Sequence, residues 1–307
     1  MTPMAHGTVD LSADSARLAS IPLGTTSQER RTGRGRRRAT ASLRHIVLIA
    51  IALLFFFPVL LLVSTSLKTA QDVRVNPFGF FSSFSFENIV NAWVQGNFSE
   101  YMLNSFVLAT PATLLVLVLS AMAGYAFARL PFRGRGIAFA LVVLGILVPF
   151  FTYMIPLYFE LQGIGLLDNA IGVILVMATG GVAFGTFFMR AFFADLPQEI
   201  EQAARMDGCS EWQIFLRVML PLVRNGIGAL AVFTFLQNWN NFLIPLLYLP
   251  GGSFRPLTMG LFQFTGGHTI EVGPLAAATL ITILPVLALF LVMQRQLTDG
   301  FTGAVKG

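Results

Sequence analysis

Long apolar stretches alternate with short polar ones along most of this chain. Six windows contain no Asp, Glu, Lys or Arg, and each is long enough for a membrane-spanning helix, which needs about 20 residues. The pattern therefore predicts an all-α membrane protein with six transmembrane helices. The windows are 46–67, 101–128, 136–159, 169–189, 225–254 and 272–294.

The composition agrees with a polytopic membrane protein. Hydrophobic residues make up 55% of the 307 positions and charged residues only 11%, whereas soluble domains have about 25% charged residues. Cys209 is the only cysteine, so neither a disulfide within the chain nor a cysteine-based metal site can form. The three histidines form no HExxH pattern, and we expect no metal centre.

The basic residues orient the spans. Seventeen of the 20 Lys and Arg residues fall in the N-terminal segment, in the loops after spans two and four, and at the C-terminus. Only Lys68, Arg74 and Arg255 lie on the opposite side. Because cytoplasmic loops carry the excess of Lys and Arg, we expect both termini and the loop 196–215 to be cytoplasmic.

The first 43 residues are rich in Ser, Thr, Gly and Arg and show no periodicity. We interpret residues 1–43 as a disordered basic tail and residues 44–307 as the membrane domain. The Arg-rich run 30–38 could bind RNA or anionic lipid. More often such a run only holds the N-terminus in the cytoplasm, so membrane lipid is an expected partner and nucleic acid is not.

The loop 196–215 is the most polar segment after the tail, and its sequence predicts two short helices. Pro197 suits a first helical turn, and Gly208 supplies the permissive backbone of a helix end. Ser210, with Gln213 three residues later, forms a capping box that would start the second helix.

The first of these helices has features of a surface that another protein could approach. Glu199 and Glu201 lie where the helix dipole favours acids, and Ala203 with Ala204 would form a small, flat patch. The alternative is an ordinary cytoplasmic connection between two spans.

The fifth window contains an unusual group of polar residues. Thr234, Gln237, Asn238 and Asn241 fall at helical spacing on one face, with Trp239 between them. Polar side chains within a membrane normally face the bundle interior or a cavity. Amides and an aromatic ring suit a neutral, hydroxyl-rich solute. Hydrogen bonding between helices is the alternative.

The third window contains Pro149, Thr152, Tyr153 and Pro156. Prolines in a span free backbone groups, which are tolerated where they face protein or a water-filled cavity. The span would therefore be kinked. Thr152 and Tyr153 could line a solute pathway, or the kink could serve packing alone.

Two spans have small residues at four-residue spacing. They are Ser120, Gly124 and Ala128 in the second window and Gly181 with Gly185 in the fourth. Such spacing lets helix backbones approach closely and has no implication for a substrate.

Several mechanisms are excluded or disfavoured by what the chain lacks. No charged residue lies at the middle of a predicted span, which disfavours an ion-coupled secondary transporter with a buried carboxylate. No GxSxG elbow occurs, and neither Lys68 nor Lys306 is part of a P-loop. The chain is therefore not expected to be an enzyme, and energy from ATP would come from a partner.

The loop also contains a family signature. It consists of Glu-Ala-Ala, three residues, Gly, nine residues, an aliphatic residue, one more residue and Leu-Pro. Here it reads Gln202-Ala203-Ala204, then Gly208, then Val218-Met219-Leu220-Pro221. The chain thus resembles a permease subunit of the binding-protein-dependent ABC importers, in the carbohydrate-uptake class that includes the smaller permease of the maltose importer. Gln202 replaces the usual Glu, and Glu201 is the neighbouring acid.

Further matches extend the resemblance from about residue 44 to the C-terminus. They are Asn104-Ser105, the segments 125–134, 155–158 and 239–245, and the final Gly-Ala-Val-Lys-Gly. The ending is the feature that points to the sugar class.

The resemblance implies a division of labour among subunits in a bacterial plasma (inner) membrane. The loop would be the coupling helix for a cytoplasmic ATPase dimer, which would bind ATP and Mg, so no cofactor is expected in this chain. A second, homologous permease would complete the pathway, and an extracytoplasmic solute-binding protein would deliver solute to the loops 68–100 and 249–273. The residues implied at the ATPase are Glu201, Gln202, Ala203, Ala204, Asp207 and Gly208.

Two alternatives stay open at this point. One is an ABC permease for another polar solute such as glycerol-3-phosphate, which would need a basic group along the pathway. The other is a secondary transporter.

Overall fold

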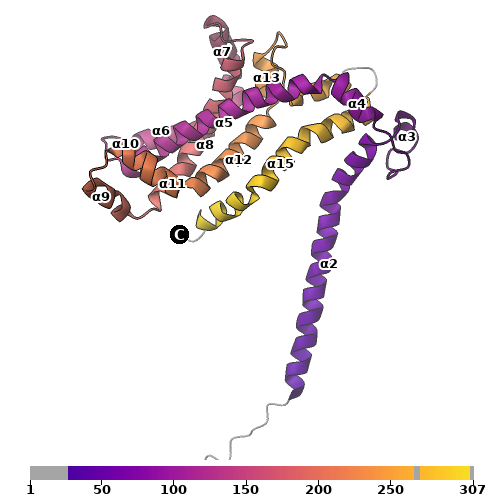
Figure 1. The fold of residues 1–307 in the computed structure, drawn as a ribbon, viewed down its shortest axis with the longest axis horizontal. Helices are drawn as coiled ribbons and strands as arrows, with labels where there is room; N and C mark the ends of the chain where they lie inside the picture. Colours follow the sequence, from indigo (N-terminus) through magenta and orange to yellow (C-terminus); the bar gives the residue numbers. More distant parts are fainter. Residues whose placement is uncertain (1–26, 266–269, 305–307) are drawn as a thin grey trace, which may run out of the picture. The chain divides into compact units, whose positions relative to one another are not determined.

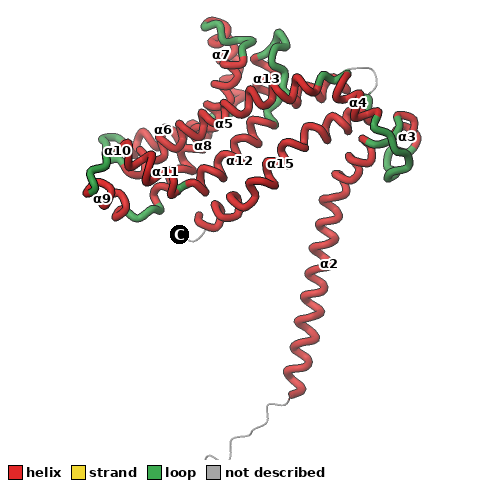
Figure 2. Tube along the Cα trace, viewed as in Figure 1, coloured by secondary structure: helices red, strands yellow, loops and turns green. Residues whose placement is uncertain are grey.

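A computed structural model describes residues 27–265 and 270–304 of the chain. Within those residues the secondary structure is helical and contains no strand (Figure 2), which confirms the all-α prediction. The chain divides into two compact units, residues 1–59 and 60–307.

The first long helix, α2, covers Ser27–Ser66 and contains a candidate span, Arg44–Ser66. It begins at Ser27, inside the segment interpreted as a disordered basic tail; that interpretation of residues 1–43 stays a prediction. Ala and Arg are among the strong helix formers, and an established helix propagates readily through them. Residues 1–26 lie outside the described part of the chain.

The second unit contains the remaining described helices, shown in Figure 1. Three of its helices are long and apolar enough to be single candidate spans, and shorter helices connect them. The elements are α3 (Ala70–Val75), α4 (Glu87–Val94), α5 (Phe98–Arg129), α6 (Arg135–Leu147), α7 (Phe150–Gly163), α8 (Ala170–Ala194), α9 (Gln198–Met206), α10 (Glu211–Gln213), the π-helix η1 (Ile214–Met219), α11 (Leu220–Leu222), α12 (Arg224–Trp239), α13 (Leu243–Tyr248), α14 (Leu257–Gly260), the 3-10 helix η2 (Leu261–Phe264) and α15 (Val272–Ala304).

The third predicted span is bent, and a second bend lies just before the start of the fifth. Helices α6 and α7 meet at 96°, and the segment Glu211–Leu222 meets α12 at 76°. The described part of the chain therefore has four to six candidate spans, depending on whether each bent pair is one span. The break between α6 and α7 lies at Pro149, which lacks a backbone N–H and disfavours a helical conformation at Val148. The kink expected in the third window is therefore a full break.

The helix in the fifth window, α12, is shorter than the charge-free stretch 225–254. Helix α12 ends at Trp239, and Asn241 lies beyond that end. The prediction that Asn241 shares a helical face with Thr234, Gln237 and Asn238 is wrong. The amide of Asn241 instead accepts a hydrogen bond from the Ile244 N–H at 3.0 Å, where α13 begins. Asn readily forms such local bonds to the backbone, which compete with helix continuation.

The predicted small-residue stripes lie at the contact between α5 and α8. A Cβ added to Gly185 would come within 2.2 Å of the Ser120 hydroxyl, and one added to Gly124 within 2.8 Å of the Met189 Cβ. The two helices are therefore too close for any side chain at these glycines. The contact places the C-terminal end of α5 beside the C-terminal end of α8, where the loop 196–215 begins.

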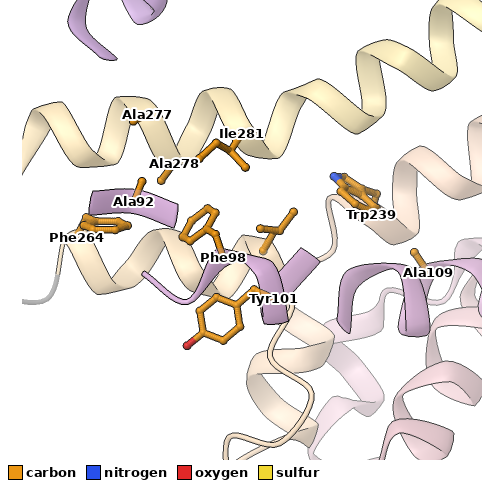
Figure 3. Close-up of a cluster of buried hydrophobic side chains, with 10 residues drawn as sticks. Ala92, Phe98, Tyr101, Ala109, Trp239, Phe264, Ala277, Ala278 and Ile281 are labelled. Carbon is orange, nitrogen blue, oxygen red and sulfur yellow. The ribbon is translucent and has the colours of Figure 1, made fainter. Parts of the chain in front are cut away.

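The other end of the second unit has its own core, which Figure 3 shows in close-up. Phe98 and Tyr101 of α5 pack there with Trp239 of α12 and Ile281 of α15. Phe264 of η2 is buried in the same cluster. The segment 249–273, named above as a loop that would meet a solute-binding protein, includes two short helices, α14 and η2, whose apolar side chains anchor it. Residues 266–269 lie outside the described residues.

Candidate functional site

Helix α9 begins and ends at residues whose local chemistry explains its limits. Pro197 is the N-cap. At the other end the Cys209 N–H donates to the Ala204 carbonyl and the Gly208 N–H to the Arg205 carbonyl. These two bonds, with Gly208 at φ +79°, form a Schellman motif. The predicted capping box of Ser210 and Gln213 is confirmed at the start of α10.

Helix α9 is amphipathic, and its two faces divide the residues of the signature. Glu201 and Ala204 are buried, with 5% and 8% exposure. Gln202 and Ala203 are exposed on the opposite face, as are Asp207 and Gly208 after the helix. The expected flat patch of Ala203 and Ala204 is therefore wrong, because successive helical residues point about 100° apart. Only Ala203 is at the surface.

Arg129, the last residue of α5, lies beneath the buried face of α9. Its Nε and Nη2 donate to the Phe193 carbonyl at 2.8 and 2.5 Å, and Nη2 also donates to the Leu196 carbonyl. The Nε atom lies 3.3 Å from Glu201 Oε1, and the two side chains are 5% and 6% exposed. The guanidinium thus satisfies carbonyls at the end of α8 and faces an acid of α9.

Below this ion pair, α9 rests on an aromatic core. Ala204 and Ile214 pack with Tyr125, Phe193 and Phe215. The Tyr125 ring lies 5.1 Å from that of Phe215 and 5.5 Å from that of Phe193. These contacts come from α5, α8 and η1, so α9 is fixed to two spans and to the start of the next.

A second, exposed ion pair holds the end of α9 to α10. Arg205 donates two hydrogen bonds to Glu211, at 2.8 and 3.2 Å. The hydrogen bond from Arg205 holds the pKa of Glu211 below its ordinary value. Both side chains are largely exposed, at 42% and 54%, so the pair contributes little to stability.

Met206 is the residue of this loop that the sequence interpretation missed. Its side chain is 88% exposed on the outward face of α9, and Trp212 on α10 is 57% exposed. Large apolar side chains exposed on an otherwise polar, well-packed helix are typical of protein interfaces. The signal in the sequence was an isolated apolar residue in a highly polar loop.

Three of the polar residues proposed for a solute pathway are buried within this chain. Asn238 donates to the Thr113 hydroxyl at 3.1 Å, and the Trp239 indole N–H donates to the Thr282 carbonyl at 3.2 Å. Thr234 is 5% exposed. These side chains link α12 to α5 and α15.

Two of the remaining pathway candidates lie at the surface. Gln237 is exposed on α12 and Thr152 on α7, while Tyr153 is partly buried. The Tyr153 ring lies 5.4 Å from that of Phe150. The pathway candidates therefore do not converge on one site in this chain. Among the described residues, no cluster of three or more His, Cys, Asp or Glu could hold a metal ion.

A cavity of about 650 Å³, lined equally by polar and apolar residues, lies at the end of the unit opposite α9, between α3, α4 and the start of α15. Arg74, Glu87 and Glu271 contribute charges to its lining, and Asn91 and Gln95 contribute amides. One wall is held in place by the buried Lys68, which donates to the Asn76 carbonyl at 2.8 Å. Asn88 donates back to the Lys68 carbonyl at 2.6 Å.

Comparison with known proteins identifies close relatives in sequence. The chain is 35% identical to the diacetylchitobiose uptake system permease protein NgcG of Streptomyces coelicolor, over 86% of this chain and 88% of that one. It is also 35% identical to the arabinooligosaccharides transport system permease protein AraQ of Bacillus subtilis, over 84% of this chain and 92% of that one.

The fold resembles a solved structure of a bacterial ABC transporter involved in the import of the acidic polysaccharide alginate. The TM-score is 0.74 at 21% identity, covering 90% of this chain and 99% of that chain. A second structure, the alginate ABC transporter in complex with an alginate pentasaccharide-bound periplasmic protein, matches with a TM-score of 0.64 at 16% identity over 85% of this chain and 94% of that one. At these identities the likeness concerns the fold alone.

A family model matches residues 116–299, which include α9 with its buried and exposed faces, the signature and α12. Together with the relatives, which are matched over 88% and 92% of their length, this match means that the chain is a multi-pass transport subunit and not an enzyme. The chain belongs to the family described as the binding-protein-dependent transport system inner membrane component.

Proposed function

We propose that this chain is the permease subunit of an ATP-driven importer for a saccharide, and that it binds a separate cytoplasmic ATPase through the exposed face of α9. The observation that supports the proposal best is the 88% exposure of Met206 on a firmly anchored helix. We call Gln202, Ala203, Met206, Asp207 and Gly208 the docking surface.

The docking surface combines features that suit a protein cleft. Ala203 and Gly208 are small enough for close approach, and Met206 is an adaptable apolar side chain that fills irregular pockets. Gln202 offers an amide donor and acceptor where the signature normally has an acid. Because Glu201 is buried, it does not replace that acid at the partner's surface.

The membrane arrangement in this proposal has six spans with both termini in the cytoplasm. Each bent pair, α6 with α7 and the segment 211–222 with α12, then counts as one span. A second permease would face the exposed Thr152 and Gln237. One chain alone does not bring the candidate pathway residues together, and this favours a pathway shared between two permeases.

The cavity between α3, α4 and α15 fits the face that an extracytoplasmic solute-binding protein would meet. Its carboxylates and guanidinium form no ion pairs with one another among the described residues. Charges left unpaired around a cavity are available to a partner with complementary charges.

The proposed substrate class follows from the relatives, whose names refer to oligosaccharides. A phosphorylated polyol such as glycerol-3-phosphate is the second candidate. It would require a basic group in the pathway, and the predicted spans have none at mid-depth. A saccharide needs only hydrogen-bonding side chains.

The test is purification of the tagged chain from its native membranes in mild detergent, with partners and bound small molecules identified by mass spectrometry. We expect an ATPase, a second permease and a solute-binding protein that carries a saccharide.

The informative variant is Met206→Asp, which places a charge on the docking surface without touching the core. We expect it to lose most of the ATPase while the chain still inserts.

The matched control is Phe132→Asp, the same kind of change at a side chain that is 44% exposed after α5. It should retain the ATPase. Equal ATPase recovery from Met206→Asp and the unmodified chain would refute the docking surface. A phosphorylated ligand on the solute-binding protein would overturn the substrate class but not the coupling.

A further inference from the structure

The buried pair of Arg129 and Glu201 is the point at which α9 meets two membrane-spanning helices. Arg129 ends α5, its guanidinium binds the carbonyls at the end of α8, and Glu201 faces it from α9. We call Arg129, Glu201 and the carbonyls of Phe193 and Leu196 the anchor.

The anchor is built differently from the exposed ion pair in the same loop. Its side chains are 5% and 6% exposed, whereas Arg205 and Glu211 are 42% and 54% exposed. A buried charge whose partner is removed is left without compensation, and a surface charge is simply solvated. Arg205 Nη2 also lies 3.6 Å from Glu201 Oε2, but both residues belong to α9, so that contact cannot hold α9 to another helix. Among the ion pairs of the described residues, the pair of Arg129 and Glu201 is the one that joins α9 to α5.

The geometry of the guanidinium also explains why a single residue can join three elements. The planar fork of Arg presents several N–H groups in fixed directions. Here they reach the Phe193 carbonyl in the last turn of α8 and the Leu196 carbonyl just beyond it, while the positive charge faces the Glu201 carboxylate. A Lys at this position would supply the charge but not the fork.

We propose that the anchor is the link that makes α9, α5 and α8 move as one body when the partner ATPase closes. This inference rests on the proposed docking of α9. Without the anchor, a displaced α9 would tilt on its apolar core instead of transferring the displacement to the spans. Arg129 and Glu201 are thus positioning residues for transport and do not contact the solute.

The test measures a distance in the complete transporter purified from native membranes. Nitroxide labels are placed at Leu114→Cys on α5 and Gln198→Cys on α9, both exposed, in a Cys209→Ser background. Leu114 lies roughly 22 Å along α5 from Arg129, at 1.5 Å per residue. Distances are recorded without nucleotide and with ATP plus vanadate.

With the anchor intact we expect one narrow distance distribution that is the same in both conditions. Glu201→Gln, which keeps the size of the side chain but removes the charge, should give a distribution that shifts or broadens only with ATP plus vanadate. Arg129→Lys should behave in the same way to a smaller degree. The matched control Glu211→Gln removes an ion pair of the same loop and should leave the distribution unchanged.

The outcomes separate this inference from the proposed docking. If the ATPase is retained but Glu201→Gln and Arg129→Lys respond to nucleotide like the parent, the anchor is not the link. A parent distance that itself changes with nucleotide would also overturn the inference while leaving docking intact. Loss of the ATPase from the parent protein would instead contradict the proposed function. A shift in Glu201→Gln that is absent without nucleotide and appears only with ATP plus vanadate would exclude simple destabilisation as its cause.

Discussion

Asn238 on α12 is a buried amide whose hydrogen bond to the Thr113 hydroxyl crosses to α5. Such bonds between helices in a membrane are worth roughly 0.6–2 kcal/mol. Asn238→Leu should therefore lower the free energy of unfolding by about that amount, measured by denaturation in detergent. If Asn238 instead contacts solute, uptake should fall without a loss of stability.

The interaction can be isolated by a double-mutant cycle with Thr113→Val. Because the two side chains are partners, the double variant should be less destabilised than the sum of the single variants. Additive effects would mean that the hydrogen bond makes no net contribution.

At the scale of elements, the contact between α5 and α8 depends on glycines that leave no space for a side chain. Gly185→Ala would place a methyl group 2.2 Å from the Ser120 hydroxyl, so the helices must separate. Forcing extra volume into a packed contact costs about 1–3 kcal/mol. We expect a clear fall in unfolding temperature and in the amount of folded protein.

Gly180 on the same helix provides the matched control, because a Cβ there would meet nothing within 4 Å. Gly180→Ala should be neutral or stabilising by up to about 1 kcal/mol, since Ala is the better helix former. Equal effects of the two substitutions would contradict the close packing of α5 on α8.

At the scale of the whole molecule, the proposed topology predicts which residues can be labelled from outside. Cys209, the only cysteine, lies in the loop expected in the cytoplasm. In intact cells a membrane-impermeant maleimide should not react with it. Cysteine introduced at the exposed Gln95 of the Cys209→Ser protein should react.

Permeabilised membranes supply the control for this experiment, because Cys209 is partly exposed and should react once the reagent can enter. Labelling of Cys209 in intact cells would reverse the orientation. Failure to label Gln95→Cys in either preparation would mean that a partner covers that side.

Sequence alone determined the features that depend on composition and on neighbouring residues. The presence of membrane helices follows from the length of the apolar runs, and the Lys and Arg residues at their ends predict an orientation for them. The Gly208 helix end and the Ser210 capping box are also local, since their hydrogen bonds join residues a few positions apart. The family signature is also a local pattern of neighbouring residues, so it indicated the position of α9 from the sequence alone.

Tertiary structure decided the features that depend on contacts between distant residues. It buried Glu201 and Ala204 and left Met206 at the surface, because α9 packs on side chains from α5, α8 and η1. It also showed Arg129 facing Glu201 and placed Asn241 beyond the end of α12. An apolar run specifies that a segment forms a helix within the membrane. Which side of that helix contacts a neighbour depends on the surfaces of the neighbouring helices, and the run itself contains no information about those surfaces.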